Sequence, residues 1–149
     1  MTLTSTSIDA TVERLVQFFE NLKHDDLPRL PEMYAPNARF KDPFNEVQGL
    51  KAIEHIFAHM FVSLDSPSFL ITERIVQGRQ CFLVWDFRFR FKRFDTTNWQ
   101  TVRGGTHLIF NDESLVTIHR DYWDAAEELY EKLPVIGRLM RWLKRQANS

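Results

Sequence analysis

The sequence predicts an α+β fold in which helices come first and a long antiparallel meander follows. Apolar residues in the first part of the chain recur at helical spacing. From Ser68 onward they alternate with polar residues instead, as in strands that bury one face. Short connections rich in turn-forming residues separate these strands. No repeat, linker or low-complexity segment divides the 149 residues, so one domain is expected over 1–149.

The first part of the chain is expected to contain three helices and one early strand. An apolar stripe that includes Val12, Leu15 and Phe19 predicts the first helix. Pro31 lacks a backbone donor, so the second helix should be short or irregular. In chain order, the expected elements are a helix over 7–23, a short helix toward Tyr34, a strand Ala38–Asp42, a loop over 44–48, and a helix that follows Gly49 and is broken by Ser66-Pro67.

The second part is expected to form four long antiparallel strands and a last helix. The predicted strands are Ser68–Val76, Gln80–Lys92, Trp99–Phe110 and Leu115–Trp123. The last helix begins near Ala125, and Pro134 should kink or restart it. Its first half is acidic and its second half basic, which suits the helix dipole. Its apolar stripe is expected to pack on the domain or on a second copy. In the alternative, its basic end with Trp142 touches an anionic membrane surface.

Composition limits the possible partners and setting of the protein. A formal net charge of -1 offers no overall attraction to nucleic acid. A single cysteine, Cys81, cannot form an internal disulfide, which favours a reducing, cytoplasmic setting. The N-terminus lacks the apolar run of a signal peptide, and no stretch approaches the roughly 18 apolar residues of a membrane span. The 13 Phe and 4 Trp indicate large side chains lining a core or a ligand cavity.

Two segments resemble the nuclear transport factor 2-like superfamily, which includes ketosteroid isomerases, SnoaL-type polyketide cyclases and limonene-epoxide hydrolases. Met-Tyr-Ala-Pro-Asn-Ala-Arg-Phe-Lys-Asp-Pro at 33–43 resembles the segment that bears the isomerase general base. His-Arg-Asp-Tyr-Trp-Asp at 119–124 resembles a last-strand signature of cyclase-like and hydrolase-like members. The resemblance covers about residues 8–125. It implies a cone-shaped, curved antiparallel sheet wrapped around the N-terminal helices, an apolar cavity, and a homodimer through the open sheet face.

The resemblance makes Asp42 the first candidate catalytic residue. Burial in an apolar cone would raise the pKa of this carboxyl toward that of a useful base. The alternative is an Asp that caps the turn of the Asp-Pro-Phe-Asn loop. The acidic donors that stabilise an enolate in the isomerases are absent, because their positions fall on Phe18 and Thr106. Ketosteroid isomerisation is therefore not expected.

Asp121 is the second candidate catalytic residue. Strand alternation places it on one face with His119 and Trp123. A cluster of Asp86, Arg88 and Asp121 would resemble the epoxide-hydrolase site, although the hydrolases have Arg before Asp on that strand. In the alternative, Asp86 and Arg88 form a salt bridge on the outer sheet face while a row of aromatic residues faces inward. That row is Trp85, Phe87, Phe89 and Phe91.

These candidates lead to two functional hypotheses. The first is a SnoaL-like enzyme that uses Asp42 and Asp121 for cofactor-independent acid–base chemistry on a small apolar molecule. The second is a non-catalytic ligand-binding or assembly module of the same fold. No metal is expected, because His55 and His59 lack a third ligand. The residues expected to line the cavity are Phe18, Tyr34, Phe40, Phe57, Asp86, Arg88, Thr106, His119 and Trp123.

Overall fold

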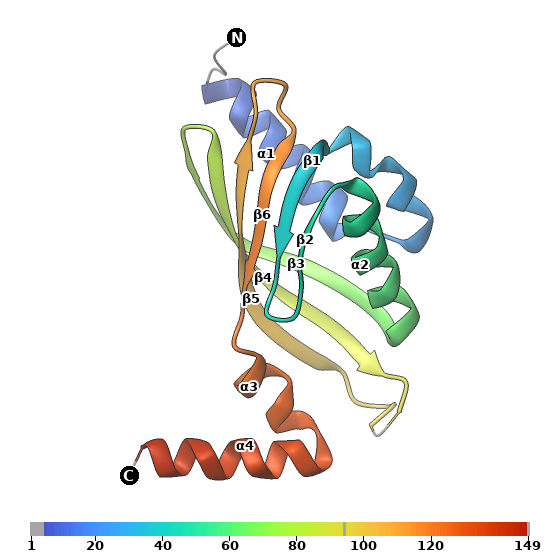
Figure 1. Cartoon of the computed structure of the whole chain (residues 1–149), viewed down its shortest axis with the longest axis vertical. Coiled ribbons are helices and arrows are strands. Elements are labelled where there is room, and N and C mark those ends of the chain that lie inside the picture. Colours follow the sequence, from blue (N-terminus) through green and yellow to red (C-terminus); the bar gives the residue numbers. More distant parts are fainter. Residues whose placement is uncertain (1–4, 94, 149) are drawn as a thin grey trace.

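The computed structural model of the chain describes residues 5–93 and 95–148. Within them the chain forms a six-stranded curved sheet with the N-terminal helices and α2 on its concave side and the C-terminal helices at its base (Figure 1). The strands are β1 (Tyr34–Lys41), β2 (Glu46–Gln48), β3 (Leu64–Gln77), β4 (Gln80–Phe91), β5 (Gln100–Phe110) and β6 (Val116–Tyr122). The helices are α1 (Ser5–Glu20), the 3-10 helix η1 (His24–Glu32), α2 (Leu50–Ser63), α3 (Ala125–Glu128), the 3-10 turn η2 (Tyr130–Lys132) and α4 (Pro134–Ala147). The predicted α+β fold is confirmed.

The strand order is β2-β1-β6-β5-β4-β3. From β3 to β6 the strands form the predicted antiparallel meander. At the other side of the sheet, β1 runs parallel to β6, with Phe40 opposite His119. This single parallel pairing brings the N-terminal part of the chain beside the last strand. It also places Tyr34 and Phe40 next to His119.

Several element boundaries differ from the prediction. Residues 44–48 were expected as a loop, but β2 pairs with the end of β1 in a hairpin. A strand of three residues is too short to show an alternating pattern, so sequence periodicity could not reveal it. β1 starts at Tyr34 rather than Ala38, and its register shifts between Tyr34 and Arg39, around Pro36. Pro134 restarts the last helix as predicted, since it is the first residue of α4.

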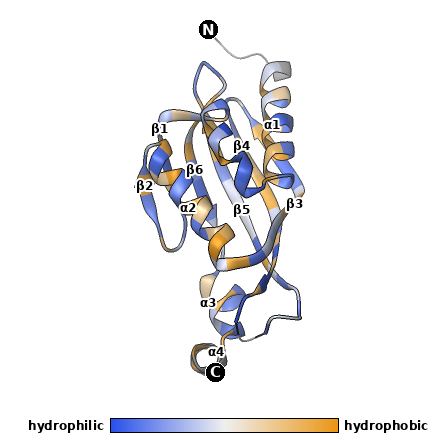
Figure 2. Cartoon of the chain, turned by 90° about the vertical axis from the view of Figure 1, so that its right-hand side faces the viewer, coloured by the Kyte–Doolittle hydropathy of each residue, from blue (hydrophilic) through white to orange (hydrophobic). Residues whose placement is uncertain are grey.

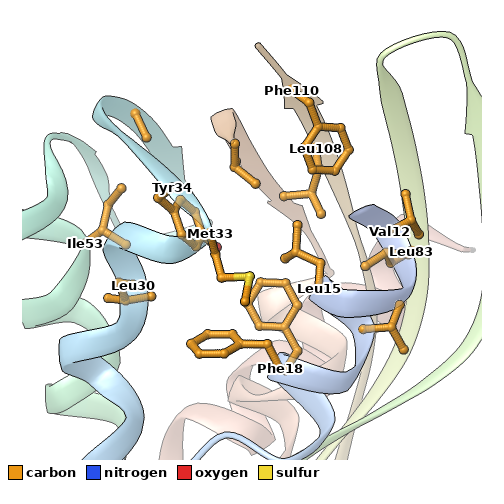
Figure 3. Close-up of a cluster of buried hydrophobic side chains, with 14 of the residues drawn as sticks. Val12, Leu15, Phe18, Leu30, Met33, Tyr34, Ile53, Leu83, Leu108 and Phe110 are labelled. Carbon is orange, nitrogen blue, oxygen red and sulfur yellow. The ribbon is translucent and has the colours of Figure 1, made fainter. Parts of the chain in front are cut away.

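The main core lies between the helices and the concave face of the sheet. Figure 2 shows α1 and α2 in front of the strands, with apolar and polar bands alternating along α1. The apolar stripe of α1 meets side chains from η1, α2 and the central strands (Figure 3). Buried residues at this junction include Val12, Leu15, Leu30, Tyr34, Ile53, Leu83 and Leu108. Burying each of the aliphatic side chains stabilises the fold by about 1.5–3 kcal/mol.

A second, smaller core holds the aromatic row of β4. Trp85, Phe89 and Val102 are buried there, and Phe69 from β3 packs against Trp85. The inward position of this row leaves the alternate β4 residues on the outer face.

None of the helices within residues 5–93 and 95–148 is both long and apolar enough to cross a membrane.

Because of the buried Cys81, the free energy of unfolding should fall at alkaline pH. Burial raises the pKa of its thiol from an ordinary 9.0 to about 12, with the nearby charge of Arg74 opposing this shift. The unfolded chain releases the proton near pH 9, so the thiol's contribution to stability is present below pH 9 and is lost as pH rises to 12. Between those values the free energy of unfolding should fall by about 1.4 kcal/mol more per pH unit in wild type than in Cys81→Ala. Urea titrations between pH 9 and 11 measure both slopes, and equal slopes would contradict the prediction.

Candidate active site

The candidate active site is built around Asp121 on β6. Asp121 and His119 are two residues apart on the strand, so their side chains point to the same, concave face. Both line an internal cavity between the helices and the sheet. His119 is buried and Asp121 is partly buried.

A chain of hydrogen bonds links Asp121 to four other side chains, and we call these five residues the Asp121 network. The Tyr34 hydroxyl lies 2.7 Å from Nδ1 of His119, and Nε2 of His119 lies 2.8 Å from Oδ1 of Asp121. On the other side, the Thr106 hydroxyl lies 2.6 Å from the same Oδ1. The indole nitrogen of Trp85 lies 2.8 Å from the Thr106 hydroxyl oxygen. The network thus joins β1, β6, β5 and β4.

The groups at the two ends of this network determine which atoms donate a hydrogen bond and which accept one. Burial, together with the negative charge of Asp121, holds the pKa of Tyr34 well above its ordinary value, so its hydroxyl keeps its proton. The Asp121 carboxylate can only accept from Nε2 of His119, so in the neutral imidazole Nδ1 is an acceptor and the Tyr34 hydroxyl donates to it. His119 then carries its proton on Nε2 and donates to Asp121. At the other end, the Trp85 N–H can only donate, so the Thr106 hydroxyl accepts from it and donates to Asp121.

Two donors therefore converge on Oδ1 of Asp121. Within residues 5–93 and 95–148, no protein group donates a hydrogen bond to the second oxygen, Oδ2. Oδ2 is thus the oxygen available to accept a proton or a hydrogen bond from a ligand.

The cavity beside Asp121 is mostly apolar and small. Its volume is ≈ 20 Å³, which is room for about one water molecule. A larger ligand therefore requires the lining rings to move. The cavity is lined by Phe19, Phe57, Phe69, Ile71, Leu83, Trp85, Thr106, His119 and Asp121.

The structure brings together six of the predicted site residues. Four aromatic rings surround the imidazole of His119, and the closest is Phe40, with ring centroids 4.6 Å apart. Phe57 meets the same imidazole edge to face. The six residues are Tyr34, Phe40, Phe57, Thr106, His119 and Asp121.

Asp42 is placed outside this site. It follows β1 in the hairpin to β2, where its Oδ1 accepts hydrogen bonds from the backbone N–H groups of Phe44 and Asn45 at 2.8 and 2.6 Å. The amide side chain of Asn45 donates to the same carboxylate. The turn-capping alternative describes these contacts, because a carboxylate at the start of a tight turn satisfies its exposed N–H groups. The turn, rather than the cavity, therefore holds this carboxylate.

The structure also leaves Asp86, Arg88, Phe18 and Trp123 outside the cavity. Asp86 is opposite Arg103 on the outer sheet face, and the Arg88 guanidinium lies 5.4 Å from the centroid of the Trp99 ring. The hydrolase-like cluster with Asp121 does not form, because strand alternation turns Trp85 inward and its neighbour outward. Phe18 packs in the main core, and Trp123 packs at the edge of the second core.

Trp85 is the network member that the sequence analysis did not assign to the site. Its row was recognised, but the direction of its indole N–H depends on the neighbouring strand. Gly104 is directly opposite Trp85 on β5, and a Cβ built there would lie 2.6 Å from the indole ring. A glycine opposite a large aromatic residue on a paired strand is the signal that could have located this ring.

No metal centre is found in the described part of the chain: no three His, Cys, Asp or Glu side chains in residues 5–93 and 95–148 gather closely enough to hold one ion. His107 lies on the outer face, where its Nε2 is 2.7 Å from the side-chain oxygen of Gln80.

Comparison with known proteins identifies the family. The family model described as SnoaL-like domain matches residues 15–118. This chain belongs to the SnoaL-like domain family. The match ends one residue before His119, so the roles of His119 and Asp121 rest on the geometry above. No curated protein matches this SnoaL-like chain.

Solved structures of the same fold have names that state different activities. A proposed SnoaL-like polyketide cyclase from Jannaschia sp. CCS1 is 16% identical, with a TM-score of 0.69 over 85% of this chain and 93% of that one. AclR, a proposed hydroxylase from Streptomyces galilaeus, is 15% identical, with a TM-score of 0.68 over 88% and 100%. An LEH-like epoxide hydrolase from M. tuberculosis is 13% identical, with a TM-score of 0.64 over 83% of this chain and 86% of that one. At these identities the likeness shows the fold alone.

Tyr34→Phe should destabilise the protein by about 1–3 kcal/mol, because it leaves the buried Nδ1 of His119 without a donor. Tyr122→Phe, at an exposed tyrosine, should change stability by less than about 0.5 kcal/mol. Urea unfolding measures both changes. Nitrogen-15 NMR of wild type should show the His119 proton on Nε2. A proton on Nδ1 instead would contradict the assigned direction of the network.

Proposed function

We propose that the protein is a SnoaL-like proton-transfer enzyme in which Asp121 acts as the base. The observation that carries the proposal is a carboxylate in an apolar cavity with one oxygen held by two donors and the other uncommitted. A single such group suits a reaction in which it takes a proton from the substrate and then returns it elsewhere. Isomerisation and aldol-type cyclisation are reactions of this kind.

In this proposal Oδ2 of Asp121 removes a proton from a carbon next to a carbonyl of an apolar substrate. His119 and Thr106 hold Oδ1 in place throughout. The carboxylic acid that forms then delivers the same proton to another carbon or to a new alkoxide, which restores the carboxylate. Tyr34 and Trp85 act as positioning residues, because they contact His119 and Thr106 rather than the reacting atoms.

Epoxide hydrolysis fits less well. It needs one group to activate water and a second to protonate the epoxide oxygen. The charged residues that were to share this task, Asp86 and Arg88, are on the outer face of the sheet.

The alternative function is ligand binding without catalysis. Two observations favour it: the cavity has room for about one water molecule, and Thr106 already donates its hydroxyl proton to Asp121. A developing enolate would then lack a strong donor.

A substrate panel separates the two functions. Purified protein is incubated with enolisable cyclic ketones, polyketide-like diketones and cyclic epoxides, with and without EDTA. We expect conversion of at least one carbonyl substrate at a rate that EDTA leaves unchanged, together with incorporation of solvent deuterium at the carbon that exchanges its proton. Saturable binding of panel members without deuterium incorporation would overturn the enzymatic proposal in favour of the binding module.

A further inference from the structure

The C-terminal helix α4 presents its apolar face to the outside of the molecule. Four apolar side chains of α4 are about half exposed: Ile136 at 45%, Leu139 at 52%, Trp142 at 50% and Leu143 at 45%. Figure 1 shows α4 at the base of the molecule, extending away from the sheet. This stripe therefore does not pack on the domain, which was one of the two placements predicted for it; the other was a second copy.

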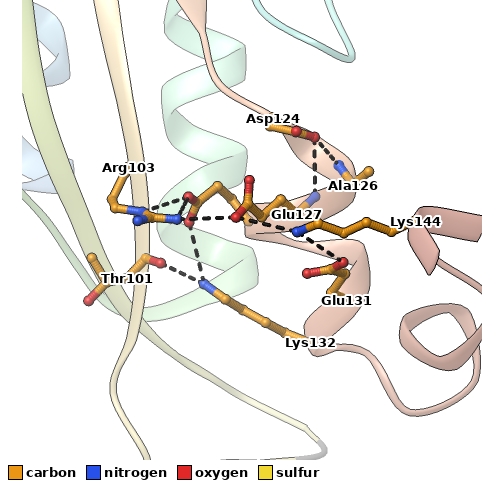
Figure 4. Close-up of polar contacts among 9 residues, drawn as sticks. Thr101, Arg103, Asp124, Ala126, Glu127, Glu131, Lys132 and Lys144 are labelled. Atoms are coloured by element: carbon orange, nitrogen blue, oxygen red, sulfur yellow. Dashed lines mark hydrogen bonds and ion pairs between the residues drawn. The ribbon is translucent and has the colours of Figure 1, made fainter. Parts of the chain in front are cut away.

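The reason is that α4 packs on the rest of the chain through its polar face. Gly137 is buried, and a Cβ built on it would lie 2.4 Å from the backbone oxygen of Glu131 in η2. Four residues on, Arg141 donates to that backbone oxygen. Lys144 lies 3.6 Å from the Glu127 carboxylate (Figure 4). Residues at positions i, i+4 and i+7 share one side of a helix, so the opposite side, with Leu139, faces outward.

The segment on which α4 rests is itself anchored to the sheet. The buried carboxylate of Glu128 in α3 accepts a hydrogen bond from Arg103 of β5 at 2.7 Å. Lys132 of η2 donates to the backbone oxygen of Thr101 at 2.5 Å, also on β5 (Figure 4). These contacts hold α3 and η2 against the sheet, so the outward direction of the apolar face of α4 is set by the fold.

The charges of α4 are of one sign. The helix contains Arg138, Arg141, Lys144 and Arg145 and no Asp or Glu. Arg138 and Arg145 lie four and three residues from Trp142, on the edge of the apolar face. Both arginines are exposed, and within residues 5–93 and 95–148 neither forms an ion pair with a carboxylate.

We infer that α4 docks on an anionic lipid surface. A helix with an exposed apolar face, a tryptophan at its edge and cationic flanks lies in the interface of a bilayer with its apolar side toward the acyl chains. The flanking arginines would then contact lipid phosphates. A second copy of the chain fits this face less well, because two α4 helices would bring their arginines together with no acidic residue on either. The inference does not depend on the proposed function.

Vesicle co-sedimentation of the full chain tests this inference. One vesicle set is phosphatidylcholine alone, and the other contains about 30% phosphatidylglycerol. Wild type should bind the anionic vesicles at least about tenfold more tightly than the neutral ones, and 0.5 M salt should weaken this binding. Leu139→Glu should abolish it. Arg138→Gln with Arg145→Gln should weaken it roughly 30-fold, since each cation near the surface contributes about a factor of five.

Two matched variants control for apolarity and charge. Ile75→Glu alters an exposed apolar side chain on β3, and Arg14→Gln with Lys51→Gln removes two exposed cations from α1 and α2. Both should bind anionic vesicles within about twofold of wild type. No wild-type binding, or equal losses in the controls, would overturn the inference. Sedimentation equilibrium is the second measurement: if Leu139→Glu dissociates a dimer and leaves vesicle binding unchanged, a second copy occupies the face instead.

Discussion

Asp121→Asn should lower kcat/KM about 10²–10⁴-fold for whichever substrate the wild-type protein converts. The asparagine oxygen can still accept hydrogen bonds from His119 and Thr106, so the network and the fold should persist. The amide nitrogen then lies at the position of Oδ2, where it can only donate and can no longer take a proton. Loss of a general base costs rates of this order. Initial-rate kinetics measure the change, with circular dichroism to show that the variant is folded.

Asp42→Asn is the matched control for this substitution. Asparagine can accept the same turn hydrogen bonds that Asp42 accepts from Phe44 and Asn45. Its kcat/KM should therefore stay within about threefold of wild type. If Asp42→Asn abolishes activity and Asp121→Asn does not, the catalytic carboxylate is Asp42 and the assignment made from the Asp121 network is wrong.

Trp85→Ala should destabilise the protein by about 3–5 kcal/mol. The indole is 4% exposed, packs against Phe69 and covers Gly104 on the paired strand. Removing it leaves a large cavity next to a glycine, which has no side chain that could fill the space. The Thr106 hydroxyl also loses its donor. Chemical denaturation with urea measures the change in unfolding free energy.

Trp85→Phe separates packing from hydrogen bonding. Phenylalanine keeps much of the ring volume but lacks the N–H that donates to Thr106. We expect a loss of about 1–2 kcal/mol, smaller than that of the alanine variant. Equal losses in both variants would show that the hydrogen bond, rather than the packing of the ring, accounts for the effect.

Much of the fold was predictable because it depends on local patterns. The alternation of apolar and polar residues along β3 to β6 predicted the meander, and the helical spacing of apolar residues predicted α1 and α2. Pro134 predicted the restart of the last helix, since proline fits the first turn of a helix but disrupts a helix when it lies in the interior. The hairpin strand β2 was missed because three residues carry no period. The parallel pairing of β1 with β6 joins distant segments, and no local signal encodes such a pairing.

The candidate site was predictable only in part. That His119 and Asp121 share one face of the strand followed from strand alternation alone. Asp42 was assigned to the cavity from a resemblance, but its burial depends on where the hairpin to β2 lies relative to the cone. In the structure its carboxylate accepts hydrogen bonds from the N–H groups of that hairpin.

By itself, the sequence determined which residues face the same side of each element, because periods of 2.0 and 3.6 are properties of the backbone. It therefore determined the fold class, the placement of the β4 aromatic residues on one shared face and the amphipathic character of α4. Only the tertiary structure decided which faces meet. It joined Tyr34 of β1 to His119 of β6, left Asp42 at a turn, and turned the apolar side of α4 outward. These outcomes depend on contacts between residues far apart in the chain, and no local pattern specifies them.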